Sequence, residues 1–268
     1  MALSTRSLSL RMGSEILVGG ARSSNAHFDL PGYNAGMRID LPVVTGRLLR
    51  RYKRFLADVE LSDGSVVTAH CPNTGSLMGC TPEGARAVLR DSQNPKRKLL
   101  YTLQTIEVDG TWVNVDTGLP NTLVAESIAD GLVPELAGYD SLRREVKYGK
   151  SSRIDVLLER ETGERCYVEV KSTTLVVGDV ARFPDAVTER GRKHLEELRQ
   201  MVREGHRAVM FFCVSRGDVT AFAPADEIDP AYGATLRAVL ADGVEAVAYS
   251  TRVTPDRFEL GERLEIRI

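Results

Sequence analysis

Two alternating segments in the second half of the chain predict a β-hairpin. Residues 153–159 and 166–171 alternate apolar and polar side chains with the period of a half-buried strand, and a polar turn separates them. Gly163 in this turn suits the left-handed position of a three-residue hairpin loop with a bulge. Such an odd loop predicts that Asp155 lies opposite Glu169 on one face of the sheet.

A short helix is predicted before this hairpin. Residues 121–131 have helical periodicity, with Asn121 or Thr122 as the N-cap and Gly131 near the end. Glu126 falls in the second turn. The positions predicted to face inward are Leu123, Val124, Ile128 and Leu132.

A longer amphipathic helix is predicted after the hairpin, over residues 188–205. Its apolar stripe contains Leu195, Leu198 and Val202. Its first turn is basic, with Arg190, Arg192, Lys193 and His194. Because acids are the usual preference at a helix start, a bound phosphate would explain these cations. A solvated basic turn is the alternative, and His194 alone is interpreted as structural.

The first half of the chain has a different pattern. Residues 43–116 contain several short strand patterns separated by turn signals such as Asp63-Gly64 and Asp109-Gly110. Such a series predicts a small barrel, and the OB-fold is a barrel whose surface suits oligonucleotides. The fold class is therefore α/β plus β.

Basic and aromatic residues are interleaved near the start of this predicted barrel. Cations at these positions would contact phosphates, and the rings could stack on bases. The alternative is that the rings pack inward and the arginines only solvate a strand. The cations are Arg47, Arg50, Arg51, Lys53 and Arg54, and the rings are Tyr52 and Phe55.

The polar side chains of the predicted hairpin have the composition of a metal site. Asp155 and Glu169 are carboxylates, the ligands that Mg²⁺ prefers, and Lys171 shares the face of Glu169. A bound Mg²⁺ or Mn²⁺ would activate water while Lys171 orients or deprotonates it, which suits phosphodiester cleavage. Glu126 could help from its helix, with a solvated Glu as the alternative. A structural ion-paired face is the alternative for the set. Glu145-Val-Lys147 has the same spacing but no acid on a preceding strand, and it is interpreted as a solvated strand face.

Charge is segregated along the chain although the total is only −2. Residues 38–106 contain eleven Lys or Arg against six Asp or Glu, whereas residues 107–268 contain 21 against 29. A basic first half joined to an acidic second half is compatible with a DNA-binding, metal-requiring protein. Binding to such a basic surface should weaken with salt.

Six blocks of the sequence resemble, in order, the sugar fermentation stimulation protein family of bacteria and archaea. They span residues 46–59, 70–78, 116–121, 152–156, 168–172 and 183–191. The order of elements, with Glu126, Asp155 and Glu169-x-Lys171, also resembles the PD-(D/E)xK nuclease superfamily, although Arg153-Ile-Asp155 replaces its leading Pro-Asp pair. The resemblance implies an N-terminal OB-fold, a C-terminal nuclease-like domain, non-specific DNA binding and a role in regulating sugar use.

These patterns predict a disordered extension over residues 1–36, an OB-fold nucleic-acid-binding domain over 37–110 and a PD-(D/E)xK restriction-endonuclease-like domain over 111–268. The leading hypothesis is a DNA-binding protein with Mg-dependent phosphodiester-cleaving activity, endonuclease or exonuclease, and RNA is a further possible substrate. One alternative is a non-catalytic DNA-binding regulator of sugar metabolism that keeps only the nuclease scaffold. An oligosaccharide-binding OB protein is the other.

Two further expectations concern the surroundings of the protein. There is no apolar run near eighteen residues, and the four cysteines lack paired C-x-x-C spacing, so we expect a cytoplasmic protein with no membrane partner. Residues 244–250 are interpreted as an exposed edge strand that could pair two copies into a homodimer, and a loop that covers this edge is the alternative.

Overall fold

The first half of the chain forms a closed barrel. The structure, a computed structural model, describes residues 37–38, 42–149 and 152–268, so the predicted extension over residues 1–36 lies outside the described residues. The barrel strands are β2 (Val43–Tyr52), β3 (Leu56–Leu61), β4 (Val66–His70), β5 (Arg86–Asp91) and β6 (Tyr101–Val108). They pair in the order β4-β3-β2-β5-β6, and β6 pairs back with β4. This closure confirms the OB-type barrel.

Apolar residues from each strand fill the barrel. Leu48, Val59, Leu89 and Ile106 come from four strands and are completely buried. A further strand, β7 (Thr111–Asn114), pairs with the outer side of β6. The predicted domain boundary after residue 110 therefore falls within the β6–β7 turn, because the first sheet continues to Asn114.

The second half contains a larger sheet. Its strands are β1 (Met37–Arg38), β8 (Ser141–Tyr148), β9 (Ser152–Glu159), β10 (Arg165–Thr173), β13 (Arg207–Val214), β15 (Glu245–Val253) and β16 (Arg257–Arg263). Their order is β1-β16-β15-β13-β10-β9-β8, and β10, β13 and β15 run parallel in the middle. The prediction that residues 244–250 form an exposed edge is wrong, since β15 is paired on both sides by β13 and β16.

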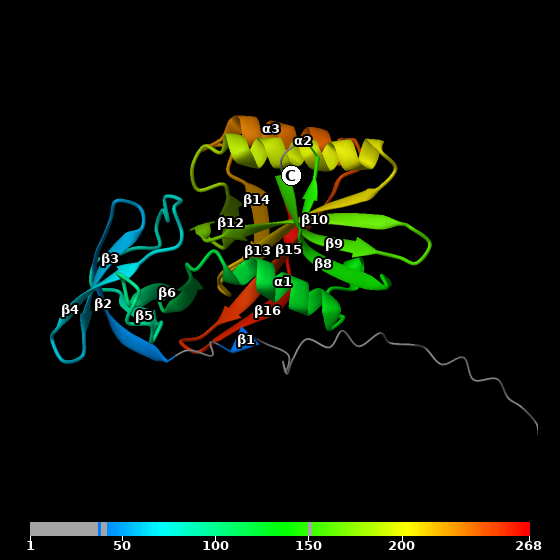
Figure 1. Ribbon diagram of the computed structural model, residues 1–268. Helices are drawn as coiled ribbons and strands as arrows, with labels where there is room; N and C mark the ends of the chain where they lie inside the picture. Colours follow the sequence, from blue (N-terminus) through cyan, green and yellow to red (C-terminus); the bar gives the residue numbers. More distant parts are fainter. Residues whose placement is uncertain (1–36, 39–41, 150–151) are drawn as a thin grey trace, which may run out of the picture.

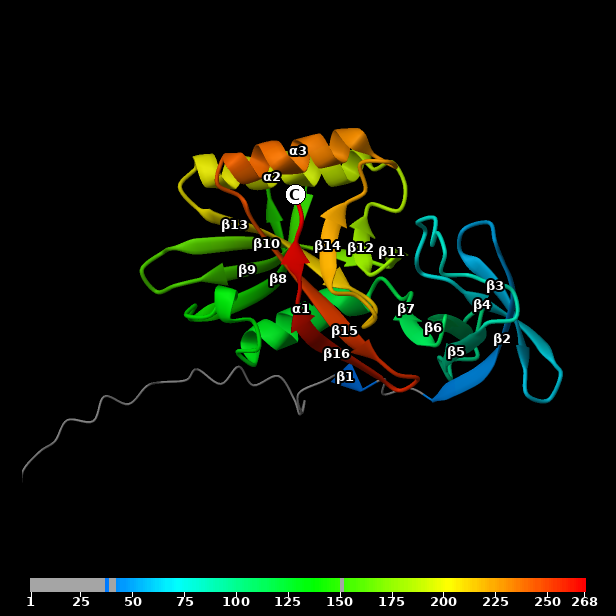
Figure 2. The same cartoon turned by 180° about the vertical axis from the view of Figure 1, so that it is seen from behind.

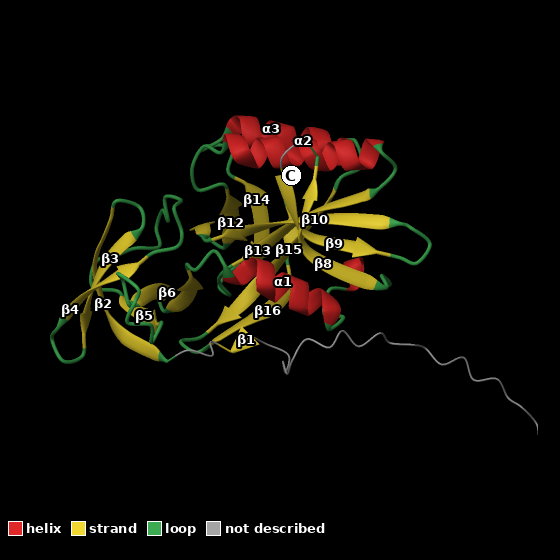
Figure 3. Ribbon diagram, viewed as in Figure 1, coloured by secondary structure: helices red, strands yellow, loops and turns green. Residues whose placement is uncertain are grey.

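Helices cover both faces of this sheet. The helices are α1 (Leu119–Ala129), α2 (Glu189–Arg203) and α3 (Pro230–Ala241), with a short 3₁₀ turn at Pro134–Leu136. Helices α2 and α3 lie side by side on one face, and α1 lies on the other (Figure 1). In the described residues all of these helices belong to the second domain (Figure 3).

A smaller sheet lies on the side of the second domain that faces the barrel (Figure 2). Its strands are β11 (Leu175–Val177), β12 (Val180–Phe183), β14 (Ala221–Pro224) and β17 (Glu265–Ile266). The segment after β12 contacts the barrel directly. Asp185 accepts hydrogen bonds from the Ser76 hydroxyl (2.7 Å to its backbone oxygen) and the Leu77 N–H (2.9 Å to Oδ2).

The predicted hairpin is present as β9 and β10. Arg165 pairs with Glu159 and Val168 with Val156, and this register places Glu169 opposite Asp155 at the next position. The loop is closed by Arg160 N–H donating to the Glu164 carbonyl at 2.9 Å, and Gly163 has φ of +90°. The predicted loop and register are therefore confirmed, because the left-handed residue that the turn needs is a glycine.

Candidate active site

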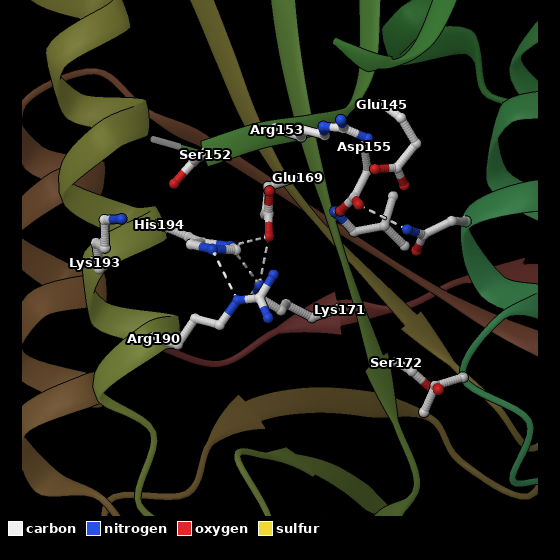
Figure 4. Close-up of a pocket in the computed structure, with 13 residues that line it drawn as sticks. Glu145, Ser152, Arg153, Asp155, Glu169, Lys171, Ser172, Arg190, Lys193 and His194 are labelled. Atoms are coloured by element: carbon white, nitrogen blue, oxygen red, sulfur yellow. Dashed lines mark hydrogen bonds and ion pairs between the residues drawn. The ribbon is translucent and has the colours of Figure 1, made fainter. Parts of the chain in front are cut away.

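The two acids of the hairpin line a cavity of about 700 Å³ between β8, β9, β10 and the first turns of α1 and α2 (Figure 4). Its charged lining is mixed in sign, with acids at the centre and cations beside them. The acids are Glu145, Asp155 and Glu169, and the cations are Arg153, Lys171, Arg190 and Lys193. A surface of this kind can take a metal ion and a phosphate together.

Glu169 is the centre of a buried hydrogen-bond network. Its side chain is 3% exposed, and Oε1 accepts from Lys171 Nζ at 2.6 Å and from Nδ1 of His194 on α2. Arg190 Nε donates to His194 Nε2 at 3.3 Å, and Lys171 Nζ lies 3.2 Å from His194 Nδ1. The other oxygen of Glu169, Oε2, is buried without a partner.

Asp155 is oriented by donors from two elements. Asn121 Nδ2 on α1 donates to Oδ1 at 2.6 Å, and the Val170 N–H donates to Oδ2 at 2.7 Å. On the other side of β9, the pairs Arg144–Val156 and Val146–Ile154 set Glu145 opposite Asp155. Glu145 has φ of +54°, a strained conformation for a residue with a side chain.

The two carboxylates of the hairpin, Asp155 and Glu169, have pKa values shifted in opposite directions. Burial, and then the charge of Glu169, raise the pKa of Asp155 to about 7. Burial is also the largest effect on Glu169, but the hydrogen bond from His194, the charges of Lys171 and His194 and the hydrogen bond from Lys171 together outweigh it and lower its pKa. The site therefore holds one firmly ionised acid beside one that releases its proton near neutrality.

The donor set fits a hard divalent cation. Glu169 Oε2 is buried without a partner, and the desolvated Asp155 lines the same cavity, so these two acids are the residues that would hold a cation. Within the described residues, no group of three or more His, Cys, Asp or Glu is arranged to hold a metal. Two carboxylates with water or phosphate oxygens as the other ligands are the coordination that Mg²⁺ favours.

The helix that was expected to supply Glu126 supplies Asn121 instead. Helix α1 begins at Leu119 with Pro120 in its first turn, and Gly118 is the N-cap without a side-chain bond, so the predicted cap at Asn121 or Thr122 is wrong. Asn121 lines the cavity, whereas Glu126, more than one turn later, is not among its lining residues. Leu132, predicted to face inward, is 45% exposed because it lies beyond the helix end.

Sequence reasoning also underestimated two residues of the cavity. Glu145 was interpreted as part of a solvated strand face, and it is exposed, but the β8–β9 pairing also sets it opposite Asp155 in the cavity lining. His194 was interpreted as structural, but it contacts Glu169 and lies one helical turn after Arg190. That i, i+4 spacing was the available signal, because it puts both side chains on one helix face.

The basic residues of the barrel differ in their contacts. Arg47 is exposed and donates to the Gly84 carbonyl at 3.2 Å, and Arg50 pairs with Asp58 at 2.8 Å over the Tyr52 ring. Lys53 is exposed in the β2–β3 turn.

The remaining arginines of this segment, Arg51 and Arg54, line a second cavity. Phe55 is 47% exposed, so it does not pack inward as the alternative required.

Of the predicted cations of α2, Arg190 and Lys193 lie at the active-site cavity, whereas Arg192 pairs with Asp229. Arg190 and Lys193 both line it from the first turn of the helix, whose N-cap Thr188 accepts from the Gly191 N–H. Lys193 also lies 3.6 Å from Glu197. Positive side chains at the positive end of a helix favour an anion there.

The first domain is a closed β-barrel. The second is an α/β domain with an acid on one strand and a Glu-x-Lys pair on the next. Together they define a class of protein, in which an OB domain is joined to a restriction-endonuclease-like domain. The chain belongs to the sugar fermentation stimulation protein family. Residues 118–257 match the sugar fermentation stimulation protein RE domain, and residues 49–115 match the SfsA N-terminal OB domain.

Named relatives cover most of the chain. The sugar fermentation stimulation protein homologues of Geobacter metallireducens and Geobacter sulfurreducens are 58% and 56% identical over 231 and 230 residues, which is 86% of this chain and 99% and 98% of theirs. The structure of Pyrococcus furiosus SfsA in complex with Ca²⁺ is similar with a TM-score of 0.79 and 29% identity, covering 88% of this chain and all of that one. No helix in the described part of the chain is long and apolar enough to span a bilayer.

Proposed function

We propose that this protein is a DNA-binding phosphodiesterase that depends on Mg²⁺ or Mn²⁺. The observation that carries the proposal is the buried Oε2 of Glu169, which has no partner and lies at a cavity shared with Asp155 and Lys171. A buried carboxylate oxygen without a donor is costly unless a cation binds it. The Ca²⁺ in the Pyrococcus furiosus relative supports a divalent ion in this family.

Each residue of the cavity has a role in this proposal. Asp155 and Glu169 hold the ion, Asn121 orients Asp155, and His194 holds Glu169 Oε1 so that Oε2 faces the cation. When bound, the ion would lower the pKa of water and offset phosphate charge. Lys171, which is anchored on Glu169 at 2.6 Å, positions the attacking water and stabilises negative charge on the phosphate.

The cations at the rim would bind the rest of the strand. Arg190, Lys193 and Arg153 line the same cavity as the acids and would contact the phosphate and its neighbours. On the barrel, Arg47, Arg50 and Lys53 are exposed and would add sequence-independent contacts. Glu126 does not line the cavity, so in this proposal it contributes only if a bound ion changes its position.

A cleavage assay tests the proposal. Purified protein is incubated with plasmid, single-stranded DNA and RNA in Mg²⁺, Mn²⁺ or EDTA, beside Lys171→Ala. Lys147→Ala is the matched control, because Lys147 is the lysine of the second Glu-x-Lys triplet but is exposed and does not line the cavity. We expect metal-dependent cutting that Lys171→Ala lowers about a hundredfold or more and Lys147→Ala leaves intact.

The same assay identifies the competing function. Wild-type protein that retains DNA but cuts none of the three substrates with either metal would overturn the proposal in favour of a non-catalytic regulator. Equal cutting by wild type and Lys171→Ala would remove Lys171 from the chemistry.

A further inference from the structure

A second cavity, of about 600 Å³, lies between the barrel and the second domain. The barrel contributes the loop 73–76 together with Arg54, and the second domain contributes the end of β10 and residues 182–188. Thr117 and Ser172 line both this cavity and the active-site cavity, so the two spaces are adjacent along β10. A polymeric ligand bound at Asp155 and Glu169 could therefore continue into the interdomain cavity.

One part of the cavity lining is rich in donors. Arg182 Nε and the Thr173 hydroxyl are buried without a hydrogen-bond partner. The one acid in the lining, Asp185, already accepts from Ser76 and Leu77. The unused groups are therefore a cationic N–H and a hydroxyl, which suit the phosphate and sugar oxygens of a nucleotide.

Another part of the lining is apolar. It consists of Phe183, Pro184, Ala186 and Val187, and Val187 is 67% exposed. Phe183 is held in place by Tyr232, whose ring centroid is 5.2 Å away at an edge-on angle. A lining that combines apolar side chains with unused donors matches a ligand with a flat apolar ring at one end and an anion at the other.

We propose that the interdomain cavity holds an unpaired nucleotide adjacent to the phosphate bound at Asp155 and Glu169. The inference rests on the proposed function, because that function places the scissile phosphate. A cavity of about 600 Å³ is in the range of small-ligand sites, and a single nucleotide is a ligand of that size. The preferred substrate is therefore single-stranded, or carries an unpaired nucleotide beside the scissile bond.

The test changes the shape of the cavity without changing its charge. Ala186→Trp adds a large side chain at an exposed position of the lining, and Ala234→Trp adds the same side chain on the exposed face of α3. Binding of a labelled single-stranded twelve-base probe and of the same sequence as a closed hairpin duplex is followed by fluorescence anisotropy in EDTA. We expect Ala186→Trp to weaken single-strand binding about tenfold or more, with duplex binding unchanged and Ala234→Trp like wild type.

A second measurement uses the unmodified protein. Single abasic sites are placed in turn along the probe, and we expect a loss of affinity when the missing base is the one that occupies the cavity. Unchanged affinity at every position, or an equal loss of single-strand and duplex binding in Ala186→Trp, would overturn the inference.

The outcomes separate this inference from the proposed function. Calorimetric titration with Mn²⁺ should be unchanged in Ala186→Trp, because the substituted side chain lies outside the active-site cavity. If wild-type protein takes up no Mn²⁺ and cuts nothing, the proposed function fails, while the anisotropy results still decide whether an unpaired nucleotide binds between the domains.

Discussion

Arg51 was predicted to bind DNA, but its guanidinium is occupied by the protein itself. Nη2 donates to the carbonyls of Arg54 (2.7 Å), Asn73 (2.9 Å) and Gly75 (2.7 Å), and Nη1 donates to Ser76 (3.0 Å). One side chain thus joins the β2–β3 turn to the loop that contacts the second domain. We predict that Arg51→Ala destabilises the protein rather than removing a phosphate contact.

The expected size follows from the burial of these bonds. Those to Asn73 and Gly75 are partly buried, and those to Arg54 and Ser76 are exposed, so water can replace the latter pair at little cost. A hydrogen bond from a charged donor contributes about 1.5–3 kcal/mol, so losing the two partly buried bonds should lower the free energy of unfolding by about 3 kcal/mol. Urea denaturation followed by fluorescence of the single tryptophan, Trp112 in β7, measures this change in the barrel.

The matched control is Arg47→Ala. Arg47 lies on the same strand but is exposed and makes a single bond to Gly84, so we expect a change within about 0.5 kcal/mol. DNA affinity is also measured as a function of salt concentration. Loss of one phosphate contact lowers the magnitude of the slope of log K against log salt concentration by about 1. An Arg51→Ala protein as stable as wild type with a reduced slope would refute the reasoning.

Three further predictions concern the acidic cavity. Mn²⁺ at about a hundredfold above its dissociation constant should raise the free energy of unfolding by about 2.7 kcal/mol, and Glu169→Gln should abolish the rise in thermal melts. The raised pKa of Asp155, about 7 against 3.8, means that the folded state keeps a proton that the unfolded state releases. Metal-free stability should therefore fall as pH rises from about 4 through 7, by up to about 4 kcal/mol, and urea curves of Asp155→Asn in EDTA should lack this part of the pH dependence. His194→Ala should lower Mn²⁺ affinity by about tenfold to a hundredfold, with Lys193→Ala near wild type by calorimetry.

The hairpin could be predicted because its determinants are local. Alternation assigns the two strands, and a glycine at the left-handed position of the loop determines the register, so Asp155 and Glu169 were placed opposite each other without tertiary information. The limits of α2 were predicted for the same reason, since Thr188 is a cap and the apolar stripe includes Leu195 and Leu198. The barrel was predictable as a type from its spacing of short strands and turns.

The rest of the site depends on contacts between segments that are distant in sequence. Glu145 reaches Asp155 only because β8 pairs with β9, and His194 reaches Glu169 only because α2 packs on the sheet. Asn121 was interpreted as a cap because its side chain often binds its own backbone, whereas it donates to Asp155 34 residues away. The position of β15 was predicted wrongly because the sequence pattern of an apolar strand is the same in the interior of a sheet and at its edge.

The loop that Arg51 holds also determines where the barrel lies relative to the acids. A Cβ atom on Gly75 would lie 3.2 Å from both carboxylate oxygens of Asp185 and 2.9 Å from Asn73 Oδ1, so the loop and the segment after β12 approach as closely as a glycine allows. That segment leads directly into α2, which carries His194 into the active-site cavity. In the proposed function, a nucleic acid bound by the barrel would therefore reach the acidic pair at a fixed distance, because the same short segment supports both surfaces. Binding and cleavage should consequently be lost together when this contact is disrupted, whereas variants confined to the acids should lose cleavage alone.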